Sequence, residues 1–141
     1  MARLGGGLDV LRRRADFVAA STDGVKIGGP IIGLHMRDRA DAGETPRVGF
    51  TVTKRVGGAV ERNRMKRRLR AAARLALDGF AKPGCDYVLI ARRAVLDVGF
   101  ERLRRDVAEA AKRAHGRSAG ARPRAAGQTD PAAGSRPESG R

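Results

Sequence analysis

Residues 47–77 read RVGFTVTKRVGGAVERNRMKRRLRAAARLAL, and this stretch decides the fold because it predicts a strand joined to a long helix. In its first seven residues, apolar side chains alternate with small or polar ones, as in a strand with one buried face. Gly57 and Gly58 interrupt that pattern. From Ala59 to Leu77, apolar residues recur at steps of three and four, which predicts a helix ending near Gly79. Its predicted buried stripe comprises Met65, Leu69, Ala72, Ala73 and Ala76.

The segments before this unit predict a helix and a strand pair. In residues 8–20, apolar residues stand near helical spacing around three consecutive arginines, which predicts a short basic helix. Residues 25–37 combine β-branched side chains with Gly28, Gly29 and Pro30, which favours a hairpin or a bent strand pair. In its second half, Gly33 and His35 face away from the apolar side. The polar residues 38–46 predict a loop.

The segments after it predict one more strand and one more helix. Residues 87–91 are continuously apolar, which suggests a strand covered on both faces. A last helix is expected at residues 99–114. Residues 1–7 are rich in glycine and predict a flexible N-terminus. Residues 115–141 contain Ala, Gly, Pro and Arg without a large apolar residue, so we expect a disordered tail.

The resulting element order, α-β-β-β-α-β-α, predicts an α+β fold in one domain at residues 8–114. A small sandwich of a central, mostly four-stranded sheet with helices against one face accounts for these elements. The opposite sheet face is then left available for a partner.

The charge balance points to a polyanionic partner. The chain has 30 Lys and Arg residues against 15 Asp and Glu residues, a formal net charge of +15. A small domain needs only about 2–8 net charges for solubility, so solubility alone is the weaker explanation. A membrane surface also attracts cations, but the chain has no Trp and only four Phe for an amphipathic anchor. Nucleic acid is therefore the expected partner.

The remaining composition argues against a metal site, a membrane span or a protein catalyst. Cys85 is the single cysteine, and His35 and His115 stand far apart in the sequence, so we expect no metal-binding cluster and a reducing, cytoplasmic location. No apolar run of about 18 residues and no secretory signal is apparent. A protein nuclease would need paired carboxylates or histidines, whereas the acids here occur singly, so no catalytic residue is expected.

The basic residues concentrate on the long predicted helix. Residues 54–74 contain nine Lys and Arg residues and one acid, Glu61. Side chains three or four positions apart share a helix face, so one stripe comprises Asn63, Arg64, Arg67, Arg70 and Arg74. Arginine forks onto phosphate or stacks on bases, and an asparagine can bond a base edge or a 2′-hydroxyl. A merely solvated face is the alternative, but the charge is almost wholly of one sign, so we predict RNA binding.

Gly57 and Gly58, ahead of that helix, also resemble a phosphate-binding turn, because exposed backbone N–H groups gather at such positions. The turn lacks the lysine-serine ending of a Walker loop and a full glycine fingerprint. We therefore prefer a plain turn from strand to helix.

The run Val56-Gly-Gly-Ala-Val-Glu-Arg-Asn-Arg-Met-Lys-Arg-Arg-Leu-Arg70 resembles the signature of the bacterial ribonuclease P protein component. The preceding strand at residues 47–55, the following strand at 86–92 and the basic segment 11–17 are similar to the same family. This resemblance spans residues 8–113. It implies a left-handed β-α-β crossover, which the residue pattern alone does not predict.

The resemblance further implies a cofactor to a catalytic RNA that removes the 5′ leader of precursor tRNA by endonucleolytic hydrolysis. Mg²⁺ would be held mainly by the RNA, with no cofactor bound by the protein alone. The expected partners are the ribonuclease P RNA and precursor tRNA, with no obligate protein partner and no membrane. By position, the residues docking on the catalytic RNA are Arg62, Asn63, Arg64, Lys66, Arg67 and Arg70.

The resemblance also implies a leader-binding cleft between the first helix and the open sheet face. Carried over by position, its residues are Phe17, Gly33, His35, Thr51 and Arg55. The sequence departs from the family at Ser21, where an aromatic residue is common, and at His35, where tyrosine is frequent. Base stacking contributes about 1–3 kcal/mol per base, so these departures predict weaker leader contact.

Two other functions fit a small basic protein. A ribosomal RNA-binding protein would co-migrate with ribosomal subunits. A nonspecific DNA-compacting protein would bind duplex DNA as tightly as structured RNA at matched salt, and all such affinities fall as salt rises.

Overall fold

The strand and helix predicted within residues 47–77 are both present in the computed structural model, which describes residues 3–5, 7–40 and 44–120. They are β5 (Arg47–Thr51) and α2 (Ala59–Ala76). The remaining elements are β1 (Arg3–Gly5), β2 (Leu8–Val10), α1 (Arg14–Asp23), β3 (Val25–Ile27), β4 (Ile32–Asp38), the 3-10 helix η1 (Lys54–Val56), β6 (Cys85–Ala91), α3 (Ala94–Asp97) and α4 (Phe100–Gly120).

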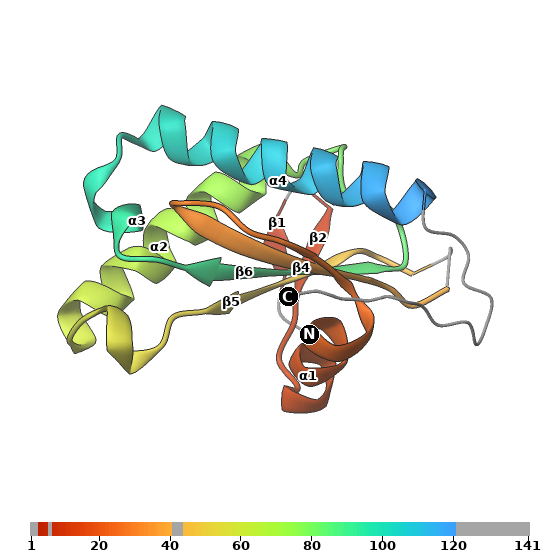
Figure 1. Cartoon of the computed structure of the whole chain (residues 1–141), viewed down its shortest axis with the longest axis horizontal. Helices are drawn as coiled ribbons and strands as arrows, with labels where there is room; N and C mark the ends of the chain where they lie inside the picture. Colours follow the sequence, from red (N-terminus) through yellow and green to blue (C-terminus); the bar gives the residue numbers. More distant parts are fainter. Residues whose placement is uncertain (1–2, 6, 41–43, 121–141) are drawn as a thin grey trace.

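The strands form one mixed sheet in the order β1-β2-β5-β6-β4-β3. The two central pairs differ in direction, since β5 runs parallel to β6 whereas β4 runs antiparallel to it. Helices α2 and α4 cover one face of the sheet, and α1 lies alone against the other face (Figure 1). The α+β sandwich predicted from the sequence is therefore confirmed.

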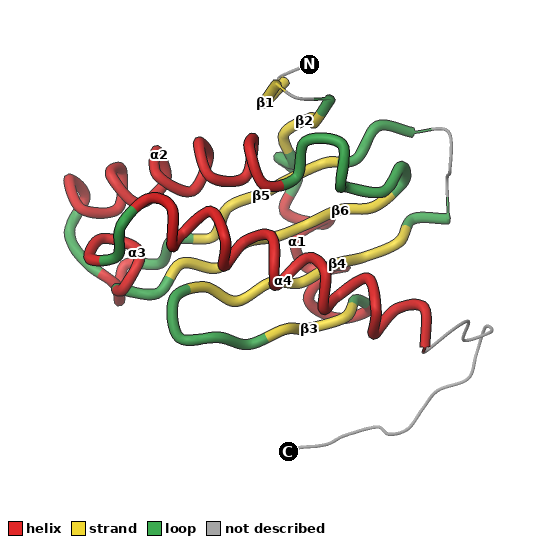
Figure 2. Tube along the Cα trace, turned by 90° about the horizontal axis from the view of Figure 1, so that it is seen from above, coloured by secondary structure: helices red, strands yellow, loops and turns green. Residues whose placement is uncertain are grey.

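The β5-α2-β6 unit joins two neighbouring parallel strands. Figure 2 looks onto the layer formed by α2 and α4, so α2 lies in front of the sheet. When β5 and β6 are turned to point upward in that view, β6 lies to the left of β5. The crossover is thus left-handed, opposite to the usual hand of such units and as the family resemblance implies.

The main core lies between the sheet and the two long helices. From α2 it takes the stripe read from the sequence, in which Met65, Leu69, Ala72 and Ala73 are fully buried. From α4 it takes Leu103, Val107 and Ala111, also fully buried. Burying such side chains contributes about 25 cal/mol per Å² of apolar surface, so the inner sides of both helices are fixed and their outer sides are free for other uses.

The helix predicted at residues 8–20 is wrong in its first half. Residues 8–10 form β2, which runs parallel to β5, and the Leu11 N–H donates to the Val48 carbonyl at 2.9 Å. The apolar spacing of Leu8 and Leu11 imitates a helix, but the two side chains enter different clusters, Leu8 in the main core and Leu11 under α1. The open edge of β5 provides backbone partners for this segment, and that long-range pairing overrides local periodicity.

The sheet has six strands rather than four, because β1 and β2 extend it beyond β5. Residues 3–5, predicted as part of a flexible N-terminus, form β1. The last helix continues past its predicted end to Gly120, and His115 lies inside it. Residues 121–141, the rest of the predicted tail, lie outside the described residues.

Candidate nucleic-acid interface

The outer face of α2 carries the predicted docking residues. Since the helix buries the Met65 side, the side chains on its other sides are exposed, although Arg70 reaches back over Phe50 of β5. The exposed members of this face, called here the docking face, are Asn63, Arg64, Lys66, Arg67, Arg70 and Arg74. The sequence prediction that Asn63, Arg64, Arg67, Arg70 and Arg74 share one exposed helix face is confirmed.

Within the described part of the chain, none of the cations of the docking face forms an ion pair with a carboxylate. Arg70 lies with its guanidinium carbon 5.8 Å above the centre of the Phe50 ring, within cation–π range. That contact orients Arg70 without neutralising it. The docking face is therefore a set of like charges whose repulsion an external polyanion would relieve.

Two arginines of α2 also donate hydrogen bonds to the chain's own backbone. Arg62, predicted to dock RNA, is partly buried, and its Nε donates to the carbonyl of Gly57 at 3.1 Å in the turn before the helix. Arg68 reaches the other way and donates to the backbone carbonyls of Val95, in α3, and Val98, which directly follows α3. Both arginines hold backbone carbonyls that lack a helical partner.

The Gly57-Gly58 turn is occupied by the chain's own carboxylate. Glu61 Oε1 accepts from the Gly58 N–H at 3.2 Å, and its two oxygens accept from Arg93 at 2.8 and 2.7 Å. The side-chain hydrogen bond from Arg93 is the main cause of the lowered pKa of Glu61. This geometry favours the plain strand-to-helix turn over a phosphate-binding turn.

The open sheet face, opposite α2 and α4, contains most of the residues predicted for the leader cleft. One cross-strand row places Thr51 beside Ile90 and Ile90 beside Gly33. The next row places Gly49 beside Val88 and Val88 beside His35. Gly33, His35 and Thr51 therefore share one face, as their alternation in the sequence predicts.

Phe17 of α1 lies on this same face but is tightly packed. A Cβ added to Gly49 would approach Phe17 Cζ to 2.6 Å, so only glycine leaves room for the ring. Phe17 also belongs to a small apolar cluster with Leu11, Ala20, Val88 and Ile90. It is half-buried, so one part of the ring supports α1 and another part meets solvent.

The remaining predicted cleft residue and one departure from the family lie near the ends of this face. Arg55 is exposed in η1, beyond the end of β5. Ser21 is half-buried in α1, one helical turn after Phe17. Burial, followed by the charge of Lys26, lowers the pKa of His35, so its ring is neutral near pH 7.

A buried ionic cluster, called here the Asp86 cluster, anchors α1 to the sheet. Asp86 is fully buried, and its carboxylate accepts two hydrogen bonds from Arg47, at 2.8 and 2.9 Å. Arg39 and Arg37 approach the same carboxylate to 3.2 and 3.8 Å. Asp16 of α1 pairs with Arg37 and Arg47 at 3.6 and 3.5 Å, which ties the helix to the strands.

Sequence reasoning missed this cluster because its five members come from three strands, a loop and α1. One signal was available: Asp86 follows Cys85 at the start of an apolar run, and a carboxylate there needs a cationic partner. The matching cations could not be chosen without the strand register.

Cys85 and Tyr87 are structural, as their positions at the start of a strand suggest. The Tyr87 hydroxyl forms a hydrogen bond with His115 Nε2 at 2.7 Å and accepts another from the Lys82 N–H at 2.9 Å. The His115 ring stacks on the Phe80 ring. Burial raises the pKa of the Cys85 thiol to about 11. These contacts explain why α4 stays ordered past residue 114.

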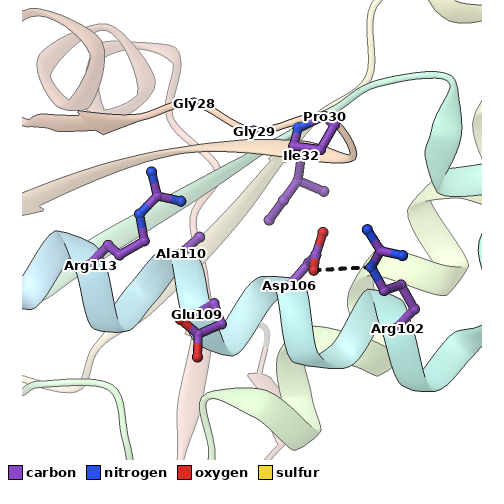
Figure 3. Close-up of a pocket in the computed structure, with 9 residues that line it drawn as sticks. All are labelled: Gly28, Gly29, Pro30, Ile32, Arg102, Asp106, Glu109, Ala110 and Arg113. Atoms are coloured by element: carbon purple, nitrogen blue, oxygen red, sulfur yellow. Dashed lines mark ion pairs between the residues drawn. The ribbon is translucent and has the colours of Figure 1, made fainter.

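A pocket of about 210 Å³ lies between the β3–β4 turn and α4 (Figure 3). Gly28 and Gly29 line one side, and Asp106 and Arg113 line the other. Asp106 is paired with Arg102 at 3.5 Å. Acids offset the cations here, so the pocket lacks the single-sign charge of the docking face.

In the described ranges, no group of three or more His, Cys, Asp or Glu side chains is arranged to hold a metal ion. Among the same residues, no helix is long and apolar enough to cross a membrane.

Comparison with known proteins agrees with the sequence resemblance. A family profile described as Ribonuclease P matches residues 8–115. The ribonuclease P protein component of Caulobacter vibrioides is 50% identical over 97 residues, which cover 69% of this chain and 64% of that protein. The component of Brucella suis is 39% identical over 125 residues, covering 80% of this chain and 88% of that protein.

Solved structures confirm the fold. The RNase P protein of Thermotoga maritima superposes with a TM-score of 0.64 at 27% identity, covering 74% of this chain and 96% of that one. The RNase P protein of Staphylococcus aureus gives a TM-score of 0.64 at 22% identity, covering 74% and 94%. The profile match spans most of the chain, and the described fold agrees with these structures. The resemblance read from the Arg62-Asn63-Arg64 motif is therefore confirmed, and the chain belongs to the ribonuclease P protein family.

Proposed function

We propose that the chain is the protein subunit of a ribonuclease P holoenzyme. It binds the catalytic RNA through α2 and binds the 5′ leader of precursor tRNA on the open sheet face. The leader is then removed endonucleolytically to give the mature 5′ end. The single observation that carries this proposal is the docking face, a stripe of exposed cations that form no ion pair with any described carboxylate, in a chain of this family.

The residues predicted to dock on the catalytic RNA differ in how exposed their side chains are. Asn63, Arg64, Lys66, Arg67 and Arg70 are exposed and can contact phosphates or base edges. Arg62 contributes indirectly, because its Nε is engaged by Gly57 and only the outer part of its guanidinium group remains for RNA. Arg64 and Arg67, three residues apart near the middle of the face, should carry the largest share of binding.

The leader would lie across the open face, beside Phe17, Gly33, His35 and Thr51, with Arg55 at the end of β5. Gly33 is buried, so the face offers the half-buried side chains of Thr51 and His35 and one partly exposed aromatic ring, that of Phe17. A neutral His35 can stack or form a hydrogen bond, but it adds no charge near pH 7. We expect modest leader affinity that depends on shape and stacking.

Catalysis belongs to the RNA in this proposal. Mg²⁺ would be held mainly by the RNA, as the family resemblance implies. The protein neutralises phosphates on one side and positions the leader on the other, which lowers the entropic cost of reaching the reactive geometry. A cytoplasmic location follows from this role and is compatible with the free, buried Cys85.

The test is reconstitution of the full chain with its cognate RNA at low Mg²⁺, with leader removal measured as the rate of cleavage. We expect the wild-type chain to stimulate cleavage and the Arg64→Ala, Arg67→Ala double variant to require a higher protein concentration. Unchanged cleavage on adding the wild-type chain would exclude the proposal.

A matched control separates this surface from overall charge. Arg105→Ala with Arg113→Ala removes the same two charges from exposed positions of α4. The α2 variant should reduce the salt dependence of RNA affinity by about one unit of slope for each phosphate that it no longer neutralises, and the α4 variant should leave it near the wild-type value. Equal losses of affinity from both variants would favour nonspecific electrostatic binding.

A further inference from the structure

Glu61 is the one acid among the basic residues 54–74, and a carboxylate inside an RNA-binding surface opposes binding. Its side chain is 41% exposed, so it does not fill the core. It pairs with Arg93, whose side chain is 55% exposed, and such exposed pairs add little to stability. Glu61 also caps the start of α2, because its Oε1 accepts from the Gly58 N–H at 3.2 Å. A glutamine would accept the same hydrogen bond, so neither core packing nor capping alone requires a carboxylate at this position.

The Arg93 guanidinium joins three segments. Nη1 donates to the Val56 carbonyl at 2.8 Å and to Glu61 Oε1 at 2.8 Å, and Nη2 donates to Glu61 Oε2 at 2.7 Å. Val56 ends η1, Glu61 stands in the first turn of α2, and Arg93 immediately precedes α3. These hydrogen bonds are called here the Glu61–Arg93 clamp.

Both ends of the clamp rest on rigid structure. The Leu96 N–H donates to the Arg93 carbonyl at 3.0 Å, and Val95, two residues on, is fully buried. Arg68 adds a second link between α2 and the α3 region through the Val95 and Val98 carbonyls. Figures 1 and 2 both place α3 beside the start of α2. Through its hydrogen bond to Arg93, the Val56 carbonyl is therefore held in place relative to α2 and α3.

The Val56 carbonyl belongs to the segment that connects the two proposed RNA-binding surfaces. Arg55 directly precedes Val56, and Thr51 of the open face lies at the end of β5, before η1. The docking face begins at Asn63, two residues after Glu61. The connection between the two surfaces thus runs through residues 52–58, and the clamp closes over its last part.

We propose that Glu61 and Arg93 are positioning residues that hold the docking face and the leader-binding face in a fixed relation. The catalytic RNA and the leader are then presented to each other in one register. This inference rests on the proposed function. It explains why an acid stands within the basic segment: the carboxylate orders the turn at the expense of some attraction to RNA.

Charge reasoning and the clamp predict opposite signs for one substitution. Glu61→Gln makes the surface more positive, so electrostatics alone predicts tighter RNA binding throughout. The clamp predicts that this variant retains or improves catalytic-RNA affinity while losing leader affinity. Arg93→Gln lowers the positive charge, yet the clamp predicts the same selective loss.

The experiment measures holoenzyme dissociation constants for precursor tRNA with a long leader and with a single-nucleotide leader. The ratio gives the leader-dependent gain. Because losing the preorganisation of a binding surface weakens affinity, we expect each single variant to reduce the gain by about tenfold. The double variant should be no worse than either single, because one clamp is lost in all three cases.

Opposite effects of Glu61→Gln and Arg93→Gln on the gain would overturn the inference and make Arg93 a direct phosphate contact. Equal loss of docking and leader affinity together with a lower Tm would also overturn it, since the pair would then only stabilise the fold. Glu101→Gln with Arg104→Gln is the matched control, because it removes another exposed pair, at 2.6 Å on α4, and should leave the gain unchanged.

The wild-type chain separates this inference from the proposed function. If wild type shows neither catalytic-RNA binding nor a leader-dependent gain, the proposed function fails. If wild type shows both and the clamp variants match it, only the clamp is wrong.

Discussion

Arginines occupy two contrasting environments in this molecule. On the docking face of α2, Arg64 and Arg67 are exposed and face no carboxylate of the described chain. In the Asp86 cluster, Arg47 and Arg39 have side chains only 25% and 13% exposed and converge on a fully buried carboxylate. One residue type therefore serves two purposes, set by whether an acid stands opposite.

The difference shows how a strongly basic chain keeps a stable fold. Cations needed near the sheet are paired with Asp86 and Asp16, and the hydrogen bonds to Asp86 raise the pKa of Arg47. The cations of the docking face, which form no ion pair with a described carboxylate, lie on the outer side of α2, where water screens their repulsion. The charge available to a polyanion is thus separated from the charge that holds α1.

The largest expected effect comes from removing the acid of the Asp86 cluster. Asp86→Asn leaves Arg37, Arg39 and Arg47 without their shared counter-charge. Breaking a buried pair costs about 3–5 kcal/mol, and the partial exposure of these arginines places the loss near the lower end. The free energy of unfolding from urea titration measures it.

Asp16→Asn is the comparison for that variant, since it removes the same charge from the same cluster but leaves the buried carboxylate in place. Its loss of stability should be clearly smaller. If Asp86→Asn unfolds at the wild-type urea midpoint, the cluster contributes nothing net and the contrast with the docking face disappears.

A second, smaller effect on stability is expected from a substitution that disturbs the packing of α1 against the open sheet face. Gly49→Ala would place a Cβ 2.6 Å from Phe17 Cζ, so the ring and α1 must shift, at a cost of about 1–3 kcal/mol. Gly28→Ala is the control, because nothing lies within 4 Å of its added Cβ. Thermal unfolding of both variants measures the difference. Equal Tm values would show that Phe17 yields easily.

Titration of the histidines gives a third and still smaller effect, because both rings are only partly buried. The folded-state pKa of His35 lies below its usual 6.5, with burial as the main cause. Above pH 6.5 the ring is neutral in both the folded and the unfolded chain. As the pH falls through the folded pKa, the unfolded chain binds the proton more readily, so stability is lost.

His35→Gln should therefore flatten the fall in unfolding free energy as the pH drops below 6.5. His115, whose pKa is also lowered by burial, should account for part of the remaining slope, which His115→Gln would reveal. A variant with the full wild-type slope would contradict the assignment for that ring.

The helical side of the molecule could be predicted from sequence because it depends on local periodicity. The stripe from Met65 to Ala73 and the single-sign charge of α2 both follow from three- and four-residue steps. The leader-face residues Gly33, His35 and Thr51 could be placed on one face by alternation alone. The leader-binding roles proposed for them follow from the family resemblance rather than from the pattern.

Features that depend on long-range pairing could not be predicted. Residues 8–10 form β2 because they pair with the edge of β5, although the spacing of their apolar residues resembles that of a helix. Helix α4 extends beyond its predicted end at residue 114 because His115 contacts Phe80 and Tyr87, which are distant in sequence. Arg62 and Arg93 gained structural roles only once the turn at residues 57–58 was known.

The smallest expected effect on stability concerns the docking face. Arg64→Ala with Arg67→Ala should change the free energy of unfolding by no more than about 0.5 kcal/mol, as is usual for surface substitutions. Its sign should favour stability, because the two like charges lie at i and i+3 and alanine is the best helix former. Urea titration at low ionic strength, where the repulsion is least screened, measures it most sensitively. A loss above about 1 kcal/mol would show that these arginines hold α2 in place, and weaker RNA binding by the double variant would then no longer identify a docking surface.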